Sequence, residues 1–231
     1  MKTSPYTQPL ADSSVLVLID VQRDFYDAGA PARIAGTHEA IPTMAKLANA
    51  FRASARPIVH VVRLYRSDGS NADMVRRQSV ERGTPIARPG TPGSQIAPEL
   101  LPDVVALDHE LLLSGGFQRL GAAEHVMYKP RWGAFYRTGL EHHLRDIGAT
   151  TIVFAGCNFP NCPHASIYQA SERDFRVILV SDAVSGLYGR GADECRGIGV
   201  VVQDLSATLN WLTEQRRPCQ STPQPTEERA P

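Results

Sequence analysis

The sequence predicts an α/β fold, a three-layer α/β/α sandwich on a doubly wound, mainly parallel sheet. Short, almost uninterrupted apolar runs alternate along the chain with segments whose apolar residues recur at helical spacing. The apolar runs lack the alternation of half-exposed strands, which is typical of strands covered by helices on both faces. Such alternation of strand and helix implies parallel strands joined by right-handed crossovers, with ligands bound beyond the strand carboxyl ends.

The first half of the chain begins with one β-α-β unit. Residues 14–20, SVLVLID, form an apolar run that ends in a carboxylate, which predicts the first strand. A helix is expected over 37–55, where apolar residues recur at helical spacing: Ile41, Met44, Ala48 and Phe51. The segment PIVHVVRLY, residues 57–65, predicts the second strand. Residues 68–103 are rich in Gly, Pro and Ser around a short helix at 72–82, so we expect an excursion over the surface.

The alternation continues in the second half of the chain. DVVAL at 103–107 and EHVMYK at 124–129 are two short strand candidates. Thr138 and Glu141 match a capping box ahead of a further helix, and Gly148 ends that helix. One stripe of this helix is apolar: Leu140, Leu144 and Ile147.

Two strands and two helices complete the domain. TTIVFAG at 150–156 and RVILVSDA at 176–183 are predicted as buried strands, with a helix over 163–174 between them. Aligned leucines indicate the final helix: Leu205, Leu209 and Leu212. All of these elements form one domain, residues 1–214. Residues 215–231 are too polar and proline-rich to pack, so we expect a disordered tail.

Composition and charge exclude several classes of partner. Of the 231 residues, 42% are hydrophobic and 21% charged, and no apolar run approaches the ~20 residues of a membrane span, so no membrane partner is predicted. Lys plus Arg and Asp plus Glu both total 24, which leaves no global field to attract nucleic acid. The N-terminal segment lacks the apolar stretch of a secretory signal, which predicts a cytoplasmic protein whose four cysteines are thiols.

The pattern of histidines and cysteines predicts neither a metal nor a cofactor. His142 and His143 are adjacent and therefore cannot share a helix face. Neither CxxC nor HExxH occurs, and the spacing of Cys157 and Cys162 is not that of a disulfide framework or a zinc site.

Three residues that could carry chemistry follow predicted strands. Asp20 ends the first strand, Lys129 ends EHVMYK, and Cys162 lies in the loop that opens a helix. In a parallel sheet these strand ends converge on one rim. A cysteine at a helix N-terminus faces partial positive charge and free backbone N–H groups, so we expect a lowered pKa for Cys162. Pro163 favours the helix start, because proline fits the first helical turn.

The three side chains have complementary chemical roles. Asp20 is the candidate base, which would take the thiol proton of Cys162 and later hand it to a leaving amine. Lys129 would hold the Asp20 carboxylate ionised and offset the negative charge that develops during attack. The backbone N–H of Cys162 could bind an oxyanion.

Three longer stretches contain or follow these residues: LVLIDVQRDF, YKPRWGAFYRTGLEHHLRDIGATTIVFAGCNFPNCP and ASERDFRVILVSDAVSG. With Asp, Lys and Cys in this order and at similar spacings across residues 14–212, the sequence resembles the isochorismatase-like hydrolases. The resemblance implies a parallel sheet of six strands and assembly into homodimers or homotetramers. It also implies that Asp20 is the base, Lys129 the family lysine and Cys162 the nucleophile.

The resemblance implies further details and shows departures. The Cys157–Asn158 bond falls where the family has a non-proline cis peptide, with the N–H groups of Asn158 and Cys162 forming an oxyanion hole. Phe159 stands where the family commonly has a small hydroxyl residue, which should alter the substrate that fits. Nicotinamidases carry an Asp-x-His metal motif after the second strand, where this chain reads VVRLYRSDGSNADMVRR, so a nicotinamidase is disfavoured.

The predicted function is hydrolysis of a carbon-nitrogen bond in a small amide, lactam or carbamoyl compound. True isochorismatases cleave a vinyl ether and lack the cysteine nucleophile, so Cys162 favours acyl or carbamoyl transfer to water through a thioester. A thiol redox protein using Cys157 and Cys162 is one alternative. A catalytically inactive binding protein on the same scaffold is the other.

The walls of the pocket are expected to be largely aromatic, which favours a planar or cyclic ligand. The predicted substrate-binding residues are Gln22, Phe25, Arg63, Tyr65, Trp132, Phe135, Tyr136, Phe159 and Tyr168. Arg76 and Arg77 are interpreted as a solvated helix face, with a substrate carboxylate or a neighbouring subunit as alternative partners.

Overall fold

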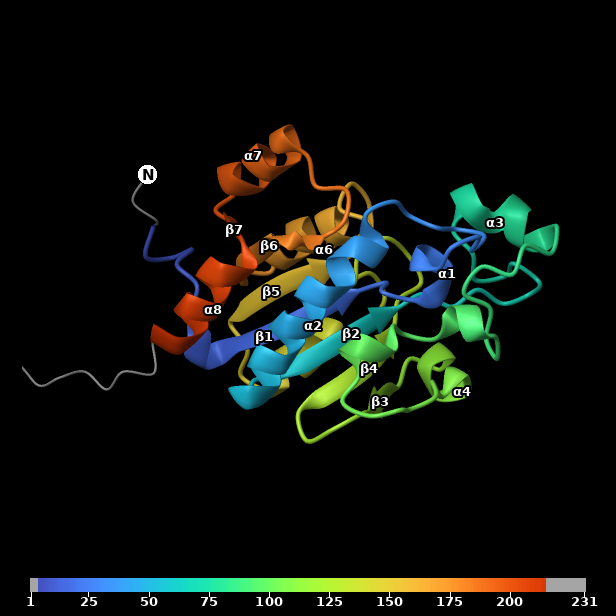
Figure 1. Ribbon diagram of the computed structural model, residues 1–231, viewed down its shortest axis with the longest axis horizontal. Helices are drawn as coiled ribbons and strands as arrows, with labels where there is room; N and C mark the ends of the chain where they lie inside the picture. Colours follow the sequence, from blue (N-terminus) through green and yellow to red (C-terminus); the bar gives the residue numbers. More distant parts are fainter. Residues whose placement is uncertain (1–3, 215–231) are drawn as a thin grey trace, which may run out of the picture.

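The computed structural model describes residues 4–214, so the tail expected at 215–231 lies outside the described residues. A seven-stranded sheet runs in the order β3-β4-β2-β1-β5-β6-β7, with helices on both faces (Figure 1). The strands are β1 Ser14–Ile19, β2 Ile58–Val62, β3 Phe117–Arg119, β4 Glu124–Tyr128, β5 Thr151–Gly156, β6 Arg176–Val184 and β7 Val201–Gln203. All neighbouring strands pair in parallel except β3 with β4. The predicted three-layer, mainly parallel fold is therefore confirmed.

Helices and short 3-10 turns connect the strands. The α-helices are α1 Arg23–Tyr26, α2 Thr37–Ala53, α3 Met74–Glu81, α4 His109–Leu113, α5 Leu140–Asp146, α6 Cys162–Ser171, α7 Gly189–Gly197 and α8 Leu205–Glu214. The 3-10 turns are η1 Ala11–Ser13, η2 Pro92–Ser94 and η3 Pro98–Leu100. None of these helices is long and apolar enough to cross a membrane.

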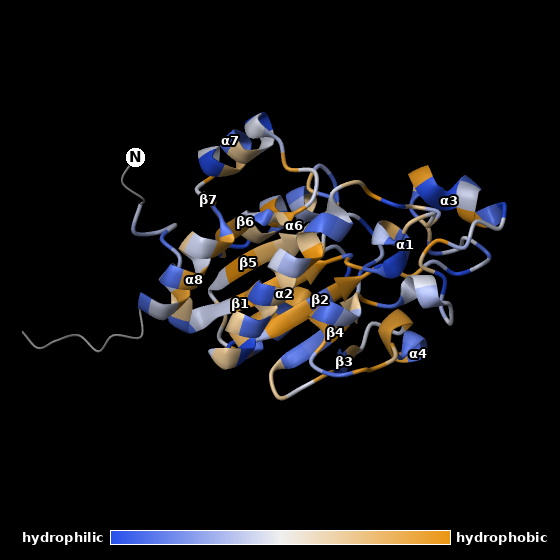
Figure 2. Ribbon diagram, in the orientation of Figure 1, coloured by the Kyte–Doolittle hydropathy of each residue, from blue (hydrophilic) through white to orange (hydrophobic). Residues whose placement is uncertain are grey.

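The central strand β1 divides its side chains between two cores. Leu16 and Leu18 pack in the cluster that contains the buried faces of α2 and α8. Val15, Val17 and Ile19 pack in the cluster that contains α5, α6 and Cys195 of α7. Because β1 is buried on both faces, its sequence is continuously apolar, and Figure 2 shows hydrophobic strands between helices with polar outer faces.

The carboxyl ends of four adjacent strands are level with one another. Ile19 of β1 lies opposite Val61 of β2 and Gly156 of β5, and Val62 lies opposite Tyr128 of β4. The residues that follow these strands therefore meet at one edge of the sheet, as expected for parallel strands.

The number and choice of strands differ from expectation. The resemblance implies six strands, whereas the sheet has seven. Segment 103–107, DVVAL, is not a strand: it is an irregular loop in which the Val104 side chain is 96% exposed. The two edge strands β3 and β7 are three residues each and lack fully buried side chains, so they give no apolar run.

The helices also differ from expectation in detail. No capping box forms at α5, because the N-cap is Gly139 and makes no side-chain bond. Thr138 Oγ1 donates to the carbonyl of Ala134 at 2.6 Å and accepts the N–H of Leu140 at 3.4 Å, not that of Glu141. Glu141 pairs with Arg173 at 2.9 Å. Helix α7 was not expected, because its sequence GRGADECRG has three glycines and only a narrow apolar face.

The excursion after β2, expected to run over the surface, also covers one end of the sheet. It carries α3, which Figure 1 shows beside α1. Ala72, Val80 and Ile86 from this segment are buried in a third cluster with Phe25 and Cys157. The excursion therefore packs over the carboxyl ends of the strands.

Candidate active site

The predicted reactive residues lie together beyond the level strand ends. Asp20 follows β1, Arg63 follows β2, Lys129 follows β4 and Cys157 follows β5. Cys162 is the first residue of α6, after a five-residue loop from β5. Asp20, Arg63 and Cys162 line one cavity, which holds about 300 Å³ of space including its open mouth. The strand order thus brings together residues that are more than a hundred positions apart.

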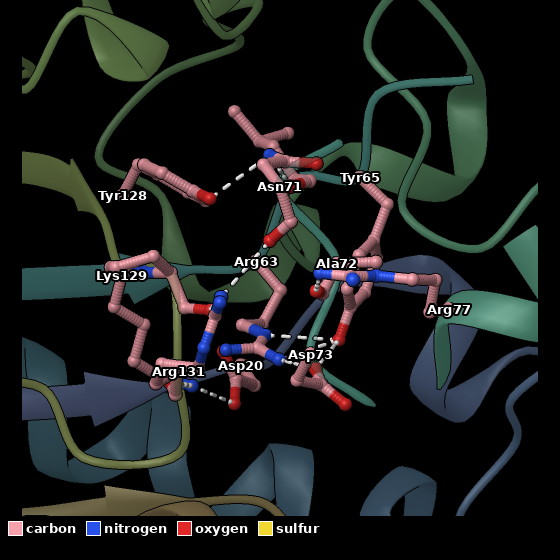
Figure 3. A network of polar contacts seen from close by, with 12 residues as sticks. Asp20, Arg63, Tyr65, Asn71, Ala72, Asp73, Arg77, Tyr128, Lys129 and Arg131 are labelled. Carbon is pink, nitrogen blue, oxygen red and sulfur yellow. Dashed lines mark hydrogen bonds and ion pairs between the residues drawn. The ribbon is translucent and has the colours of Figure 1, made fainter. Parts of the chain in front are cut away.

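Asp20 and Lys129 form a buried ion pair. Lys129 Nζ donates to Asp20 Oδ2 at 2.7 Å and to the carbonyl of Arg131 at 3.3 Å (Figure 3). The Lys129 side chain is fully buried, and Asp20 is nearly so. The second oxygen, Asp20 Oδ1, is buried and accepts no hydrogen bond from the described residues. One carboxylate oxygen is therefore held, and the other is available to a proton donor.

Cys162 is a buried thiol beside this pair. Burial raises its pKa to about 12, and the Asp20 charge adds to the effect, while the charges of Lys129 and Arg63 oppose it. The expectation that the helix N-terminus lowers this pKa was wrong, because loss of hydration outweighs the helix terminus at this site. The resting thiol is protonated at neutral pH, so reaction needs a neighbouring group that accepts its proton.

The second cysteine of the loop has a different environment. Cys157 is completely buried, and its thiol donates to the carbonyl of Asp20 at 3.0 Å. Burial raises its pKa well above the ordinary value. Both cysteines are free thiols, as is Cys195, so these three agree with the expected thiol state, and Cys219 lies outside the described residues.

The loop between β5 and α6 leaves backbone donors available. The Cys157–Asn158 peptide bond is cis, as the resemblance implies. Neither the N–H of Asn158 nor that of Cys162 donates to an acceptor in residues 4–214. Asn158 and Cys162 both line the cavity.

Arg63 is the centre of a second buried network. Its Nε and Nη2 both donate to the Tyr65 hydroxyl, at 3.1 and 2.6 Å, and Nη2 also pairs with Asp73 Oδ2 (Figure 3). The Tyr65 hydroxyl donates to the same Asp73 oxygen at 2.8 Å. Gln22 fixes the backbone of Arg63 from both sides: Oε1 accepts from its N–H at 2.7 Å, and Nε2 donates to its carbonyl at 2.8 Å.

Four of the nine predicted substrate-binding residues line the cavity: Phe25, Arg63, Tyr65 and Trp132. The full lining is Asp20, Phe25, Ile34, Arg63, Tyr65, Arg76, Trp132, Cys157, Asn158, Asn161 and Cys162. Gln22 lies behind this wall, since its amide is fully engaged by the Arg63 backbone and the Ser94 carbonyl. It therefore positions Arg63 and does not face the cavity.

The other four predicted aromatic residues lie elsewhere. Phe135 packs in the core beneath Arg173, and Phe159 is fully buried between His164 and Tyr188. Tyr136 is 42% exposed, and Tyr168 is 38% exposed in a shallow depression beside Trp132. Phe159 therefore does not stand at the pocket mouth, because its ring turns into the core.

Sequence reasoning missed two cavity residues and misread a third. The sequence gives no chemical signal for Ile34 or Asn161, because one is an isolated aliphatic residue and the other a loop amide. Arg76 was interpreted as part of a solvated face, but it lines the cavity with its guanidinium carbon 5.4 Å from the Phe25 ring centre. Helical spacing alone does not reveal which face of α3 the excursion turns inward.

No group of three His, Cys, Asp or Glu side chains within residues 4–214 has the arrangement of a metal site. The polar groups around the cavity are instead an amine, a carboxylate, a thiol and guanidinium groups. These groups suit acid–base and nucleophilic chemistry on a small polar molecule.

The fold and this rim site define an α/β protein with a cavity at the carboxyl edge of its sheet. The sequence model of the isochorismatase domain matches residues 14–112 and 115–194. The chain belongs to the isochorismatase family.

Individual relatives cover most of the chain. A protein named probable inactive nicotinamidase from Arabidopsis thaliana is 26% identical over 75% of this chain and 81% of its own length. The ureidoacrylate amidohydrolase RutB of Methylobacterium radiotolerans is 25% identical over 74% of this chain and 66% of its own. The crystal structure of an isochorismatase family protein from Desulfovibrio vulgaris is 30% identical, with a TM-score of 0.72 over 85% of this chain and 96% of that chain.

Proposed function

We propose that this protein is a hydrolase that cleaves a carbon-nitrogen bond of a small amide, lactam or carbamoyl compound through a thioester on Cys162. The observation that carries the proposal is the pairing of Lys129 with one oxygen of Asp20 while the other oxygen stays unoccupied beside a protonated thiol. This arrangement provides a nucleophile and its proton acceptor in one cavity. The amidohydrolase among the relatives supports the same class of bond.

The first half of the reaction transfers the acyl group to sulfur. Asp20 Oδ1 takes the Cys162 thiol proton as the sulfur attacks the substrate carbonyl carbon. The N–H groups of Asn158 and Cys162 donate to the oxyanion that forms, and Lys129 offsets the added negative charge. Asp20 then gives the proton to the leaving nitrogen, the carbon-nitrogen bond breaks, and ammonia or an amine departs.

The second half returns the enzyme to its starting state. Asp20 takes a proton from a water molecule as the water oxygen attacks the thioester carbon. The sulfur leaves and recovers its proton from Asp20, which releases the acid or carbamate product. Because Cys162 starts and ends as a neutral thiol, its raised pKa is compatible with this cycle.

The two alternative functions receive less support. A redox role for Cys157 and Cys162 needs a reactive thiolate, whereas burial raises the pKa of both thiols. An inactive binding protein remains relevant because one relative is named inactive. A buried, protonated Cys162 should react slowly with an alkylating reagent in both a hydrolase and an inactive binding protein. Turnover of a substrate is therefore the measurement that separates these two functions.

The test is turnover and adduct formation by Cys162 variants. We expect wild-type protein to release ammonia or amine from at least one compound in a panel of ureides, carbamoyl amino acids, lactams and small amides. Cys162→Ala should lose at least 10²-fold in kcat and the substrate-derived adduct on this residue in mass spectrometry. Cys195→Ala, at a buried thiol of α7 outside the cavity, is the matched control and should keep both. Full turnover by Cys162→Ala would disprove the mechanism.

A further inference from the structure

The charged groups around the cavity do not balance. Lys129 is matched by Asp20, and Arg63 is matched by Asp73. Arg76 also lines the cavity, but no carboxylate among the described residues pairs with it. The cavity wall therefore carries about one uncompensated positive charge, which favours an anionic ligand.

A further buried carboxyl near this region does not supply the missing charge. Asp24 of α1 accepts the backbone N–H of Ala87 at 2.6 Å and does not line the cavity. Burial raises the pKa of this carboxyl above its ordinary value, and no ion pair joins Asp24 to Arg76 within residues 4–214. The positive charge of Arg76 therefore remains without an ion-pair partner at the cavity wall.

Arg63 lines the same cavity and has one unused donor. Its Nε and Nη2 are bound by Tyr65 and Asp73, but Nη1 is buried and has no partner in residues 4–214. Arg63 is only 3% exposed, so this nitrogen has lost its water without gaining an acceptor. A buried donor without an acceptor is destabilising unless a ligand oxygen accepts from it.

The two guanidinium groups are close to the same aromatic ring. The Arg63 guanidinium carbon lies 5.1 Å from the centre of the Tyr65 ring, and that of Arg76 lies 6.0 Å from it. Phe25 and Trp132 add aromatic surface to the cavity wall around them. A ligand here meets apolar walls and two cationic donors, an arrangement that binds a carboxylate on a short organic chain.

We propose that Arg76 and Nη1 of Arg63 form a carboxylate subsite, so that the substrate is a small amide that also bears a carboxylate. This inference rests on the proposed function, since the amide carbon must lie at Cys162 while the carboxylate lies at the arginines. The cavity, about 300 Å³ with its open mouth included, limits such a molecule to a short chain. Monoamides of short dicarboxylic acids have these features.

Direct binding tests the subsite without requiring turnover. Malonamate, succinamate and glutaramate, each compared with its neutral diamide, are titrated calorimetrically into Cys162→Ala protein. We expect at least one monoamide to bind tenfold or more tightly than its diamide. Adding Arg76→Gln should reduce that preference about tenfold, since the charged hydrogen bond is lost. Arg82→Gln, at an exposed arginine just after α3, should leave it unchanged.

The outcomes separate the subsite from the chemistry. If no monoamide is preferred over its diamide, or if Arg76→Gln keeps the preference, the subsite is wrong. If wild-type protein hydrolyses neutral diamides and carboxylate-bearing monoamides equally well, the proposed function stands and the subsite is wrong. Binding of a monoamide that depends on Arg76, with no hydrolysis of it by wild-type protein, would keep the subsite and remove the proposed function.

Discussion

At the scale of residues, the site depends on a fully buried lysine, Lys129. A lone lysine is ordinarily solvated, and burying an ammonium group is favourable only when a carboxylate and further acceptors surround it. Lys129 meets this condition through Asp20 and the carbonyl of Arg131. Each member of the pair therefore depends on the other for its burial.

This dependence predicts a non-additive effect on stability. Lys129→Met should lower the free energy of unfolding by about 3–5 kcal/mol, because it leaves the Asp20 carboxylate buried without its cation. The double variant Asp20→Asn with Lys129→Met should recover part of this loss, since no unpaired charge remains. Urea denaturation at pH 7 measures both. Equal stability of Lys129→Met and wild-type protein would contradict the buried pair.

Single residues also show where sequence reasoning stops. Asp20, Lys129 and Cys162 could be predicted to meet, because parallel strands bring their carboxyl ends to one edge. The predicted substrate-binding aromatics were less reliable. Trp132 and Phe135 are three residues apart, yet one lines the cavity and the other packs in the core. Residues 132–135 lie in an irregular turn, so no helix or strand periodicity indicates which side chain points into the cavity.

At the scale of elements, a polar cluster ties helix α2 to strands β2 and β4. Glu124 at the start of β4 accepts from Arg52 of α2 at 2.7 Å and bonds to His60 of β2 at 2.7 Å. Strands β2 and β4 belong to the half of the sheet that holds Lys129. Burial alone would raise the pKa of Glu124, but the bonds and charges of Arg52 and His60 lower it to about 2.

The cluster predicts a pH-dependent contribution to stability. A lowered carboxyl pKa stabilises the fold above the ordinary value of 4.5, and this contribution is lost as the pH falls toward 2. Glu124→Gln should therefore cost roughly 2–3 kcal/mol at pH 7 and progressively less below pH 4.5. Denaturant unfolding at several pH values measures the difference.

A matched variant controls for the removal of a carboxylate in general. Glu172→Gln, at an exposed residue after α6, should change stability by less than about 0.5 kcal/mol at every pH. A cost of Glu124→Gln that stays constant from pH 7 to pH 3 would contradict the ionic origin of the effect.

The elements that could be predicted are those buried on both faces. Strands β1, β2 and β5 read as apolar runs because both sides are covered. Segment 103–107 contains the same residue types, but it lies in the excursion, where Val104 faces solvent. Local composition does not distinguish an interior run from an exposed one, so that strand was predicted wrongly.

At the scale of the whole molecule, helix α3 of the excursion begins with two exposed apolar side chains. Met74 and Val75 are consecutive residues of α3 and are 83% and 72% exposed, and Figure 2 shows the hydrophobic colour on this outlying helix. Neighbouring exposed apolar side chains of this size are typical of surfaces that contact another protein. The cytoplasmic location inferred from the N-terminal sequence stays a prediction.

These exposed residues support the expected self-association. We expect a native mass of two or four times the 25.2 kDa of one chain, because closed homo-oligomers commonly bury such surfaces. Met74→Ser with Val75→Ser should weaken association by tenfold or more, measured by sedimentation equilibrium at micromolar concentration. Val104→Ser, at a still more exposed apolar side chain outside α3, should leave the association constant unchanged. A wild-type protein that sediments as a monomer throughout this range would contradict the expected assembly, whereas an oligomer insensitive to the α3 substitutions would place its interface elsewhere.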